Sequence, residues 1–263
     1  MGNDGALRLS IVQTPIVWED IDANVNYYGE LLYGLKSKTD LAVLPEFCTT
    51  GWSLRPETLA EPNDGKTINA MKQYARDCNL AITGSFMASD NGRYYNRAFF
   101  LTPDGQAFFY DKRHLFTIDG EDKYFSPGTK RLIVDYRGWK ICLMVCYDLR
   151  FPVWSRNVGN EYDLLIYVAN WAEARKKVWR TLLEARAIEN MCYVCGVNRI
   201  GTDANGYVYH GDSQVFSPKG VKLYGAKEHE EVVVTGVLKR EEPENLRTKF
   251  PVWKDADQFD MKI

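Results

Sequence analysis

The chain has 263 residues, of which 45% are hydrophobic and 26% charged, and its formal net charge is −2. A chain of this length can bury a sizeable core, and its near-neutral balance offers no electrostatic footprint for nucleic acid or for an anionic membrane. No apolar run is long enough to cross a bilayer, and the first residues carry no apolar signal segment. We therefore expect a cytoplasmic globular protein that binds neither nucleic acid nor membrane.

Apolar runs of strand length recur along the chain, and two segments, 21–35 and 174–190, have the periodicity of amphipathic helices. The predicted strands are 9–13, 41–44, 80–86, 98–101, 132–134, 140–145, 164–168, 193–197 and 231–234. Most of these runs are continuously apolar rather than alternating. This pattern predicts sheets that helices cover on at least one face.

Two segments, 40–46 and 163–170, resemble each other. We expect each to follow a helical segment and to precede a helix that leads into another apolar strand. Two such half-repeats predict a single domain over residues 1–263, an α/β protein built as a four-layer α-β-β-α sandwich, in preference to an open doubly wound sheet. No predicted strand is followed by a glycine-rich phosphate loop, so the sequence lacks the motif that usually indicates a nucleotide cofactor.

The six cysteines predict reduced thiols rather than a disulfide framework. Cys192 and Cys195 match the spacing C-x-x-C, but no second ligand pair at a suitable distance is present, and the chain has only three histidines. Residues 193–197 also have the composition of a buried strand, on which free cysteines are common. We therefore expect no metal site.

Three polar residues stand directly after apolar strands, where functional groups collect in layered α/β folds: Glu46, Lys112 and Cys146. Each alone has an ordinary explanation, as a capping carboxylate, a solvated lysine or a buried inert thiol. Together they would supply a base, an electrophilic stabiliser and a nucleophile. We expect a helix entered at Pro152 to follow Cys146, and we expect nearby backbone N–H groups and Lys112 to favour the thiolate.

Residues 44–46, 110–116 and 145–152 resemble the three signatures of the nitrilase superfamily of carbon–nitrogen hydrolases. The resemblance covers residues 7–260 and, within the superfamily, is to the bacterial omega-amidases. It implies an α-β-β-α sandwich that usually dimerises, a Glu-Lys-Cys triad and no cofactor.

Carried over to this chain, the resemblance makes Glu46 the general base, Lys112 the stabilising cation and Cys146 the nucleophile. It also implies a second glutamate near the lysine, which is Glu121, with Asp122 as its competitor.

The reaction that we expect is a two-step amide hydrolysis through a thioester on Cys146. Lys112, which we expect to stay charged between its carboxylates, and the backbone N–H of Tyr147 would hold the oxyanion. Asp148 and Arg150 could bind substrate or form an internal pair that fixes the cysteine turn, and both interpretations stay open.

The subgroup resemblance implies a small dicarboxylate monoamide as substrate, such as 2-oxoglutaramate or 2-oxosuccinamate. Its free carboxylate needs a cationic partner. Arg175 is a candidate clamp and Trp171 a candidate substrate contact, although Arg175 also fits a solvated arginine at a helix start. The alternatives are an N-carbamoyl amide hydrolase, an aliphatic amidase, a nitrilase, or a non-catalytic interaction module.

Overall fold

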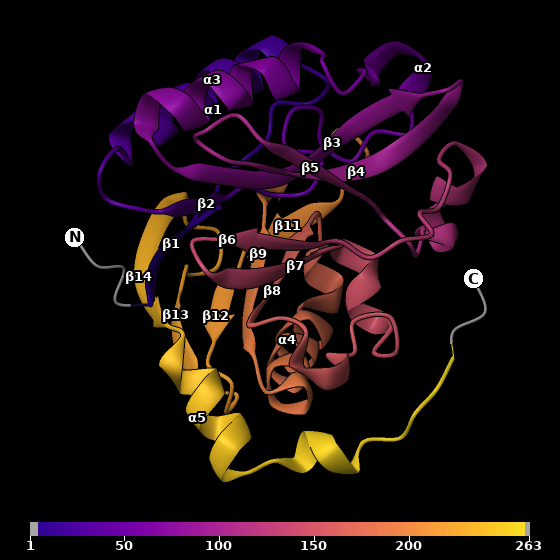
Figure 1. Cartoon of the computed structure of the whole chain (residues 1–263). Coiled ribbons are helices and arrows are strands. Elements are labelled where there is room, and N and C mark those ends of the chain that lie inside the picture. The colour runs from indigo at the N-terminus through magenta and orange to yellow at the C-terminus, as the bar shows by residue number, and fades with distance from the viewer. Residues whose placement is uncertain (1–4, 261–263) are drawn as a thin grey trace.

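Two six-stranded sheets lie face to face in the computed structural model, which describes residues 5–260 (Figure 1). The first sheet contains, in spatial order, β14 (Val232–Lys239), β1 (Ala6–Gln13), β2 (Leu41–Val43), β3 (Ala81–Asp90), β4 (Arg93–Leu101) and β5 (Ala107–Asp111). The second contains β13 (Lys222–Gly225), β12 (Gln214–Phe216), β9 (Tyr193–Asn198), β8 (Leu164–Ala169), β7 (Trp139–Val145) and β6 (Ile133–Tyr136). A separate hairpin joins β10 (Ile200–Thr202) to β11 (Val208–His210).

Helices cover the outer face of each sheet (Figure 1). The α-helices of the described residues are α1 (Ile21–Gly34), α2 (Pro56–Leu59), α3 (Lys66–Cys78), α4 (Lys176–Asn190) and α5 (Glu241–Lys249). Short 3-10 helices are η1 (Thr117–Asp119), η2 (Glu121–Lys123), η3 (Cys146–Arg150), η4 (Val158–Asn160), η5 (Glu173–Arg175) and η6 (Val252–Asp255). Helices α1 and α3 lie on the first sheet and α4 lies on the second, which confirms the four-layer sandwich.

The internal resemblance of the sequence corresponds to a repeated unit in the fold. Strands β1, β2 and β3 pair in parallel in the first sheet, and β7, β8 and β9 do so in the second. The two similar segments supply β2 and β8, the middle strand of each parallel triplet. Every residue of both strands is buried, as their continuous apolar composition predicts.

The main core fills the space between the sheets. Its apolar cluster takes Leu9 and Val43 from the first sheet and Ile141, Ile166 and Val197 from the second, all of them fully buried. A second cluster lies between the first sheet and the helices α1 and α3. Burial of this kind at about 25 cal/mol per Å² holds the layers together, so groups at the strand ends are placed by a rigid scaffold.

Two local predictions were wrong. No helix begins at Pro152; instead Cys146 itself opens the 3-10 helix η3, because the Asp148 carboxylate accepts a hydrogen bond from the N–H of Val145 at 3.0 Å and closes the chain into a tight turn. Residue 163 also follows the short η4 rather than a full helix. Helix α3 is the helix expected between segment 40–46 and the next apolar strand, whereas α5 and the short strands β10 to β13 were not predicted.

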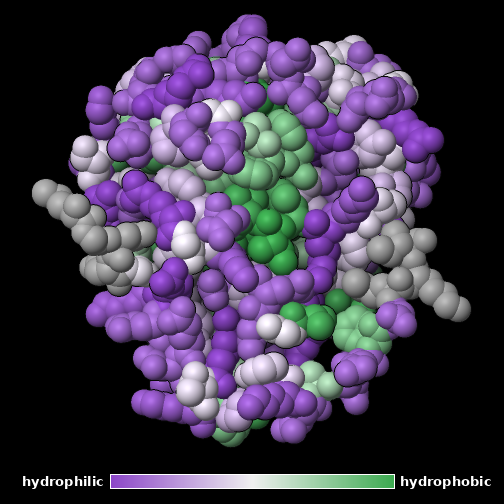
Figure 2. Space-filling view, viewed as in Figure 1, coloured by the Kyte–Doolittle hydropathy of each residue, from purple (hydrophilic) through white to green (hydrophobic). Residues whose placement is uncertain are grey.

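All six cysteines are buried free thiols. No helix within residues 5–260 has the length and apolar character needed to cross a bilayer. The face seen in Figure 2 is mostly hydrophilic. Its larger apolar patch covers the region where the edge strands β5 and β6 lie in Figure 1, and a smaller apolar patch lies at the lower right.

Candidate active site

Glu46, Lys112 and Cys146 meet in one buried site, although 66 and 34 residues separate them along the chain. Glu46 comes shortly after β2 and Lys112 directly after β5, both in the first sheet, whereas Cys146 follows β7 in the second. The Nζ atom of Lys112 lies 3.0 Å from Oε1 of Glu46, and the same carboxylate lies close enough to the Cys146 thiol to raise its pKa. Packing of the two sheets therefore creates the cluster that the strand ends predicted.

Glu121, rather than Asp122, is the second carboxylate at the lysine. Its oxygens accept hydrogen bonds from Lys112 Nζ at 2.9 and 3.1 Å, whereas Asp122 is exposed. The amide of Asn96, on β4, donates to Glu46 at 2.7 Å and to Glu121 at 3.0 Å. Buried carboxylates need such partners, and no local sequence pattern indicates that Asn96 supplies one.

The charges of this cluster depend on one another. Burial lowers the pKa of Lys112, but Glu121 and Glu46 raise it more, so the net pKa lies above the usual value and the ammonium stays protonated. Burial likewise raises the pKa of Glu121, against the opposing influence of Lys112. The expectation that Lys112 keeps its charge between two carboxylates agrees with this arrangement.

Opposing influences act on the Cys146 thiol, and Lys112 favours the thiolate as expected. Burial and the neighbouring Glu46 carboxylate raise the pKa of the thiol well above its usual value, and Lys112 offsets only part of this effect. The thiol is therefore protonated and stands beside a carboxylate that can accept its proton. Cys146 also has a φ of 43°, in the left-handed region that non-glycine residues rarely adopt.

Asp148 holds the cysteine turn against the segment that follows Lys112. Its carboxylate accepts hydrogen bonds from the Tyr110 hydroxyl at 2.7 Å and from the His114 backbone N–H at 2.9 Å, and it lies 2.8 Å from His114 Nδ1. An internal pair with Arg150 is therefore not formed. Arg150 lines the pocket next to Cys146 instead, which is the other interpretation that the sequence left open.

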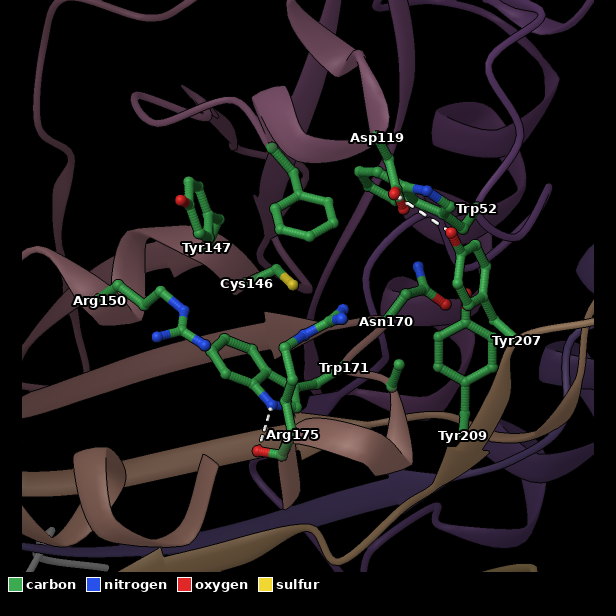
Figure 3. Close-up of a pocket in the computed structure, with 12 residues that line it drawn as sticks. Trp52, Asp119, Cys146, Tyr147, Arg150, Asn170, Trp171, Arg175, Tyr207 and Tyr209 are labelled. Carbon is green, nitrogen blue, oxygen red and sulfur yellow. Dashed lines mark hydrogen bonds between the residues drawn. The ribbon is translucent and has the colours of Figure 1, made fainter. Parts of the chain in front are cut away.

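A pocket opens beside Cys146 (Figure 3). Residues from several elements line it: Trp52, Phe116, Asp119, Cys146, Tyr147, Arg150, Asn170, Trp171, Ala172, Arg175, Tyr207 and Tyr209. Both sequence candidates for substrate contact, Trp171 and Arg175, are among them. The backbone N–H of Tyr147 directly follows the thiol, and its role at the oxyanion stays a prediction.

The pocket wall carries two guanidinium groups without a carboxylate partner. Arg150 lies over the Trp171 ring at 5.3 Å, and Arg175 lies over the Phe116 ring at 5.1 Å. Within residues 5–260 neither guanidinium has a hydrogen bond or ion pair, and both side chains are only partly buried. The acidic residue of the pocket, Asp119, instead accepts a hydrogen bond from Tyr207 at 3.1 Å.

A group of potential metal ligands lies away from the thiol, where Glu173, Glu228 and His229 approach one another within 4.8 Å. Lys176 and Arg180 already pair with Glu228 and, through these hydrogen bonds, lower its pKa to about 2. Two cations already occupy this carboxylate, so the group is a partly exposed ion-pair network.

Comparisons with known proteins agree with this geometry. Residues 8–248 match the family model described as carbon-nitrogen hydrolase. The chain is 42% identical to "Omega-amidase YafV" of Escherichia coli (strain K12) over 96% of this chain and 98% of that protein. It is 31% identical to "2-oxoglutaramate amidase" of Bacillus subtilis (strain 168) over 82% and 84% of the two chains.

Among solved structures, a carbon–nitrogen hydrolase superfamily protein of Xanthomonas campestris with an arsenic adduct in its active site superposes with a TM-score of 0.95. That protein shares 40% identity, and the match covers 98% of this chain and 99% of the other. The chain therefore belongs to the carbon–nitrogen hydrolase family of the nitrilase superfamily, and it is an amidase-type hydrolase that acts on non-peptide carbon–nitrogen bonds.

Proposed function

We propose that this carbon–nitrogen hydrolase is an omega-amidase, which releases ammonia from a small amide that also carries a carboxylate. The proposed substrates are 2-oxoglutaramate and 2-oxosuccinamate. The observation that carries the proposal is the pair of unpartnered guanidiniums, Arg150 and Arg175, in the wall of the pocket that holds Cys146. Arginine is well suited to a carboxylate because its planar fork donates two parallel hydrogen bonds. The names of the relatives support the same substrate class.

In the first step Glu46 accepts the proton of the Cys146 thiol while sulfur attacks the amide carbon. The raised pKa of the thiol makes this transfer necessary, and Glu46 is the neighbouring carboxylate that can accept the proton. Negative charge develops on the amide oxygen, where the Lys112 ammonium and the Tyr147 N–H would stabilise it. One such donor typically contributes about 3 kcal/mol to lowering the barrier.

Glu46 then returns the proton to the departing nitrogen, so that ammonia leaves and a thioester remains on Cys146. In the second step Glu46 takes a proton from water, the hydroxide attacks the thioester, and the thiol is regenerated. Glu121 pairs with Lys112 throughout and keeps the ammonium in place. Asn170 fixes the base, because its backbone N–H donates to Oε2 of Glu46 at 2.7 Å.

A substrate panel with mass spectrometry tests this proposal. We expect ammonia release from 2-oxoglutaramate and 2-oxosuccinamate and little from nitriles, N-carbamoyl amides or unsubstituted aliphatic amides. Rapid quenching should trap a thioester on Cys146. A non-catalytic interaction module would show neither turnover nor one cysteine that iodoacetamide alkylates faster than the other five. Equal turnover of carboxylate-bearing and neutral amides would contradict the assigned substrate class.

We also propose that the chain forms a homodimer, as the family resemblance implies. Exposed apolar side chains at Val153, Val158, Phe250 and Val252 provide a surface of the kind that a second copy covers. Light scattering on the purified protein tests this, and a monomeric mass at micromolar concentration would contradict it.

A further inference from the structure

One side chain, Trp171, contacts both of the arginines that face the pocket. The Arg150 guanidinium lies over its ring at 5.3 Å, and its indole Nε1 donates a hydrogen bond to the backbone carbonyl of Arg175 at 2.9 Å (Figure 3). In Figure 3 the two arginines lie on either side of the Trp171 side chain. We infer that Trp171 is a positioning residue that sets the spacing of the two guanidiniums and thereby the preference for a carboxylate-bearing amide. This inference rests on the proposed function.

Trp171 can do this because its own position is fixed from several sides. It is 3% exposed, and its ring packs against that of Trp179 at 5.6 Å. Its backbone N–H donates to Asn198 Oδ1 at 2.8 Å, and its carbonyl accepts from Asn198 Nδ2 at 3.0 Å. Because the Trp171 side chain is held in this way, the groups that contact it are held in defined positions.

The same turn also holds the reacting end of the site. Asn170, the residue before Trp171, donates its backbone N–H to Glu46 and its side-chain amide to the Glu46 carbonyl at 2.8 Å. Two adjacent residues thus connect the general base to the arginine pair. These two residues therefore set the distance between Glu46 and the two arginines. We expect this distance to select amides in which the carboxylate and the amide carbon are separated by a similar length.

The test compares Trp171→Phe with wild type on two substrates, 2-oxoglutaramate and the neutral amide butyramide. Phenylalanine keeps an apolar ring but removes the N–H donor to Arg175 and weakens the cation–π contact with Arg150. We expect KM for 2-oxoglutaramate to rise about tenfold, which is about 1.4 kcal/mol of binding, with kcat changed less than threefold. The KM for butyramide should rise less than that for 2-oxoglutaramate, because Trp171 lines the pocket but butyramide has no carboxylate for the arginines to bind. The pH profile of kcat should stay unchanged, because Glu46 and Cys146 are untouched.

Trp253→Phe is the matched control, because the indole of Trp253 also donates to an arginine carbonyl, that of Arg247 at 3.3 Å, away from the pocket. It should leave both KM values unchanged. If Trp171→Phe fails to fold by circular dichroism, Trp171→Tyr takes its place, since it also lacks the indole N–H that donates to Arg175. It should raise the same KM, and an unchanged KM in this folded variant would overturn the inference.

An unchanged KM for 2-oxoglutaramate in the folded variant would overturn the inference, and so would an equal rise for butyramide. Failure of the proposed function looks different. In that case wild type itself would show no preference for 2-oxoglutaramate over butyramide.

Discussion

Replacing Lys112 by methionine should destabilise the protein strongly, because it leaves two buried carboxylates without their shared cation. Lys112, Glu46 and Glu121 are each 0% exposed, and the ammonium lies 2.9 to 3.1 Å from the oxygens of both carboxylates. Removing one partner of a buried ion pair typically costs about 3–5 kcal/mol. At about 2–4 °C per kcal/mol for a chain of this size, Tm should fall by roughly 10 °C.

The loss of stability in Lys112→Met should be larger at pH 7 than at pH 5. Burial already raises the pKa of Glu121, Lys112 opposes that rise, and Glu46 adds to it. Without the ammonium the folded-state pKa rises further above the unfolded value of about 4.3. A carboxyl group with a raised folded-state pKa stabilises the fold below its unfolded pKa and loses that contribution as pH rises through the folded value. Lys112→Met should therefore be closer to wild type at pH 5 than at pH 7.

Urea denaturation followed by tryptophan fluorescence, at pH 7 and at pH 5, measures both effects. Lys66→Met is the control, because Lys66 forms an exposed pair with Asp22 at 2.6 Å, and it should leave the midpoint unchanged at either pH. The reasoning would be refuted by a loss of less than about 1 kcal/mol at pH 7, well under the usual cost of breaking a buried pair. It would be refuted equally by a deficit of the same size at both pH values.

Four further outcomes are expected. Cys146→Ala should abolish turnover and keep the thermal midpoint, measured by ammonia release and calorimetry. Asp148→Asn should cost about 1–3 kcal/mol of unfolding free energy, since it leaves hydrogen bonds of the cysteine turn unsatisfied, and should lower kcat. Burial lowers the pKa of His210, whose two ring nitrogens have no partner in the described residues. The free energy of unfolding should therefore fall as pH drops below about 6.5. His210→Gln should make this pH dependence weaker in urea titrations. Glu46→Gln should bind 2-oxoglutarate severalfold more tightly than wild type in isothermal titration calorimetry, because it removes the negative charge next to the carboxylate that hydrolysis creates; an unchanged affinity would contradict this.

The sequence predicted the layers and the three strand-end groups well, because both depend on short apolar runs and on the residue that follows each run. Strands β2 and β8 are continuous and fully buried, and Glu46 and Cys146 follow such runs. These features are local along the chain. Once two parallel triplets pack face to face, the ends of their strands meet at the same edge.

The missed residues depend on long-range pairing, which local patterns do not encode. Asn96 contributes through its position on β4, opposite Met87 of β3, and nothing near it in the sequence indicates a buried carboxylate. Burial of the Cys146 thiol, which raises its pKa, is likewise a property of the folded site that local sequence does not encode. Arg150 was left undecided because its nearest candidate partner, Asp148, bonds to Tyr110 and His114 instead.

For the proposed carboxylate-bearing amide, the distribution of charge in the folded site favours one direction of binding. The cluster of Glu46, Glu121 and Lys112 carries a net charge of −1 when both carboxylates are ionised, and it lies at the thiol. Along the pocket wall, Arg150 and Arg175 place two positive charges against the single carboxylate of Asp119. The carboxylate of such a substrate is repelled by the negative cluster at the thiol and attracted by the two guanidiniums of the pocket wall. Its amide carbon is then the group left to meet sulfur. Hydrolysis converts that amide into a second carboxylate beside the negative cluster, so the same charges that orient the substrate weaken binding of the product.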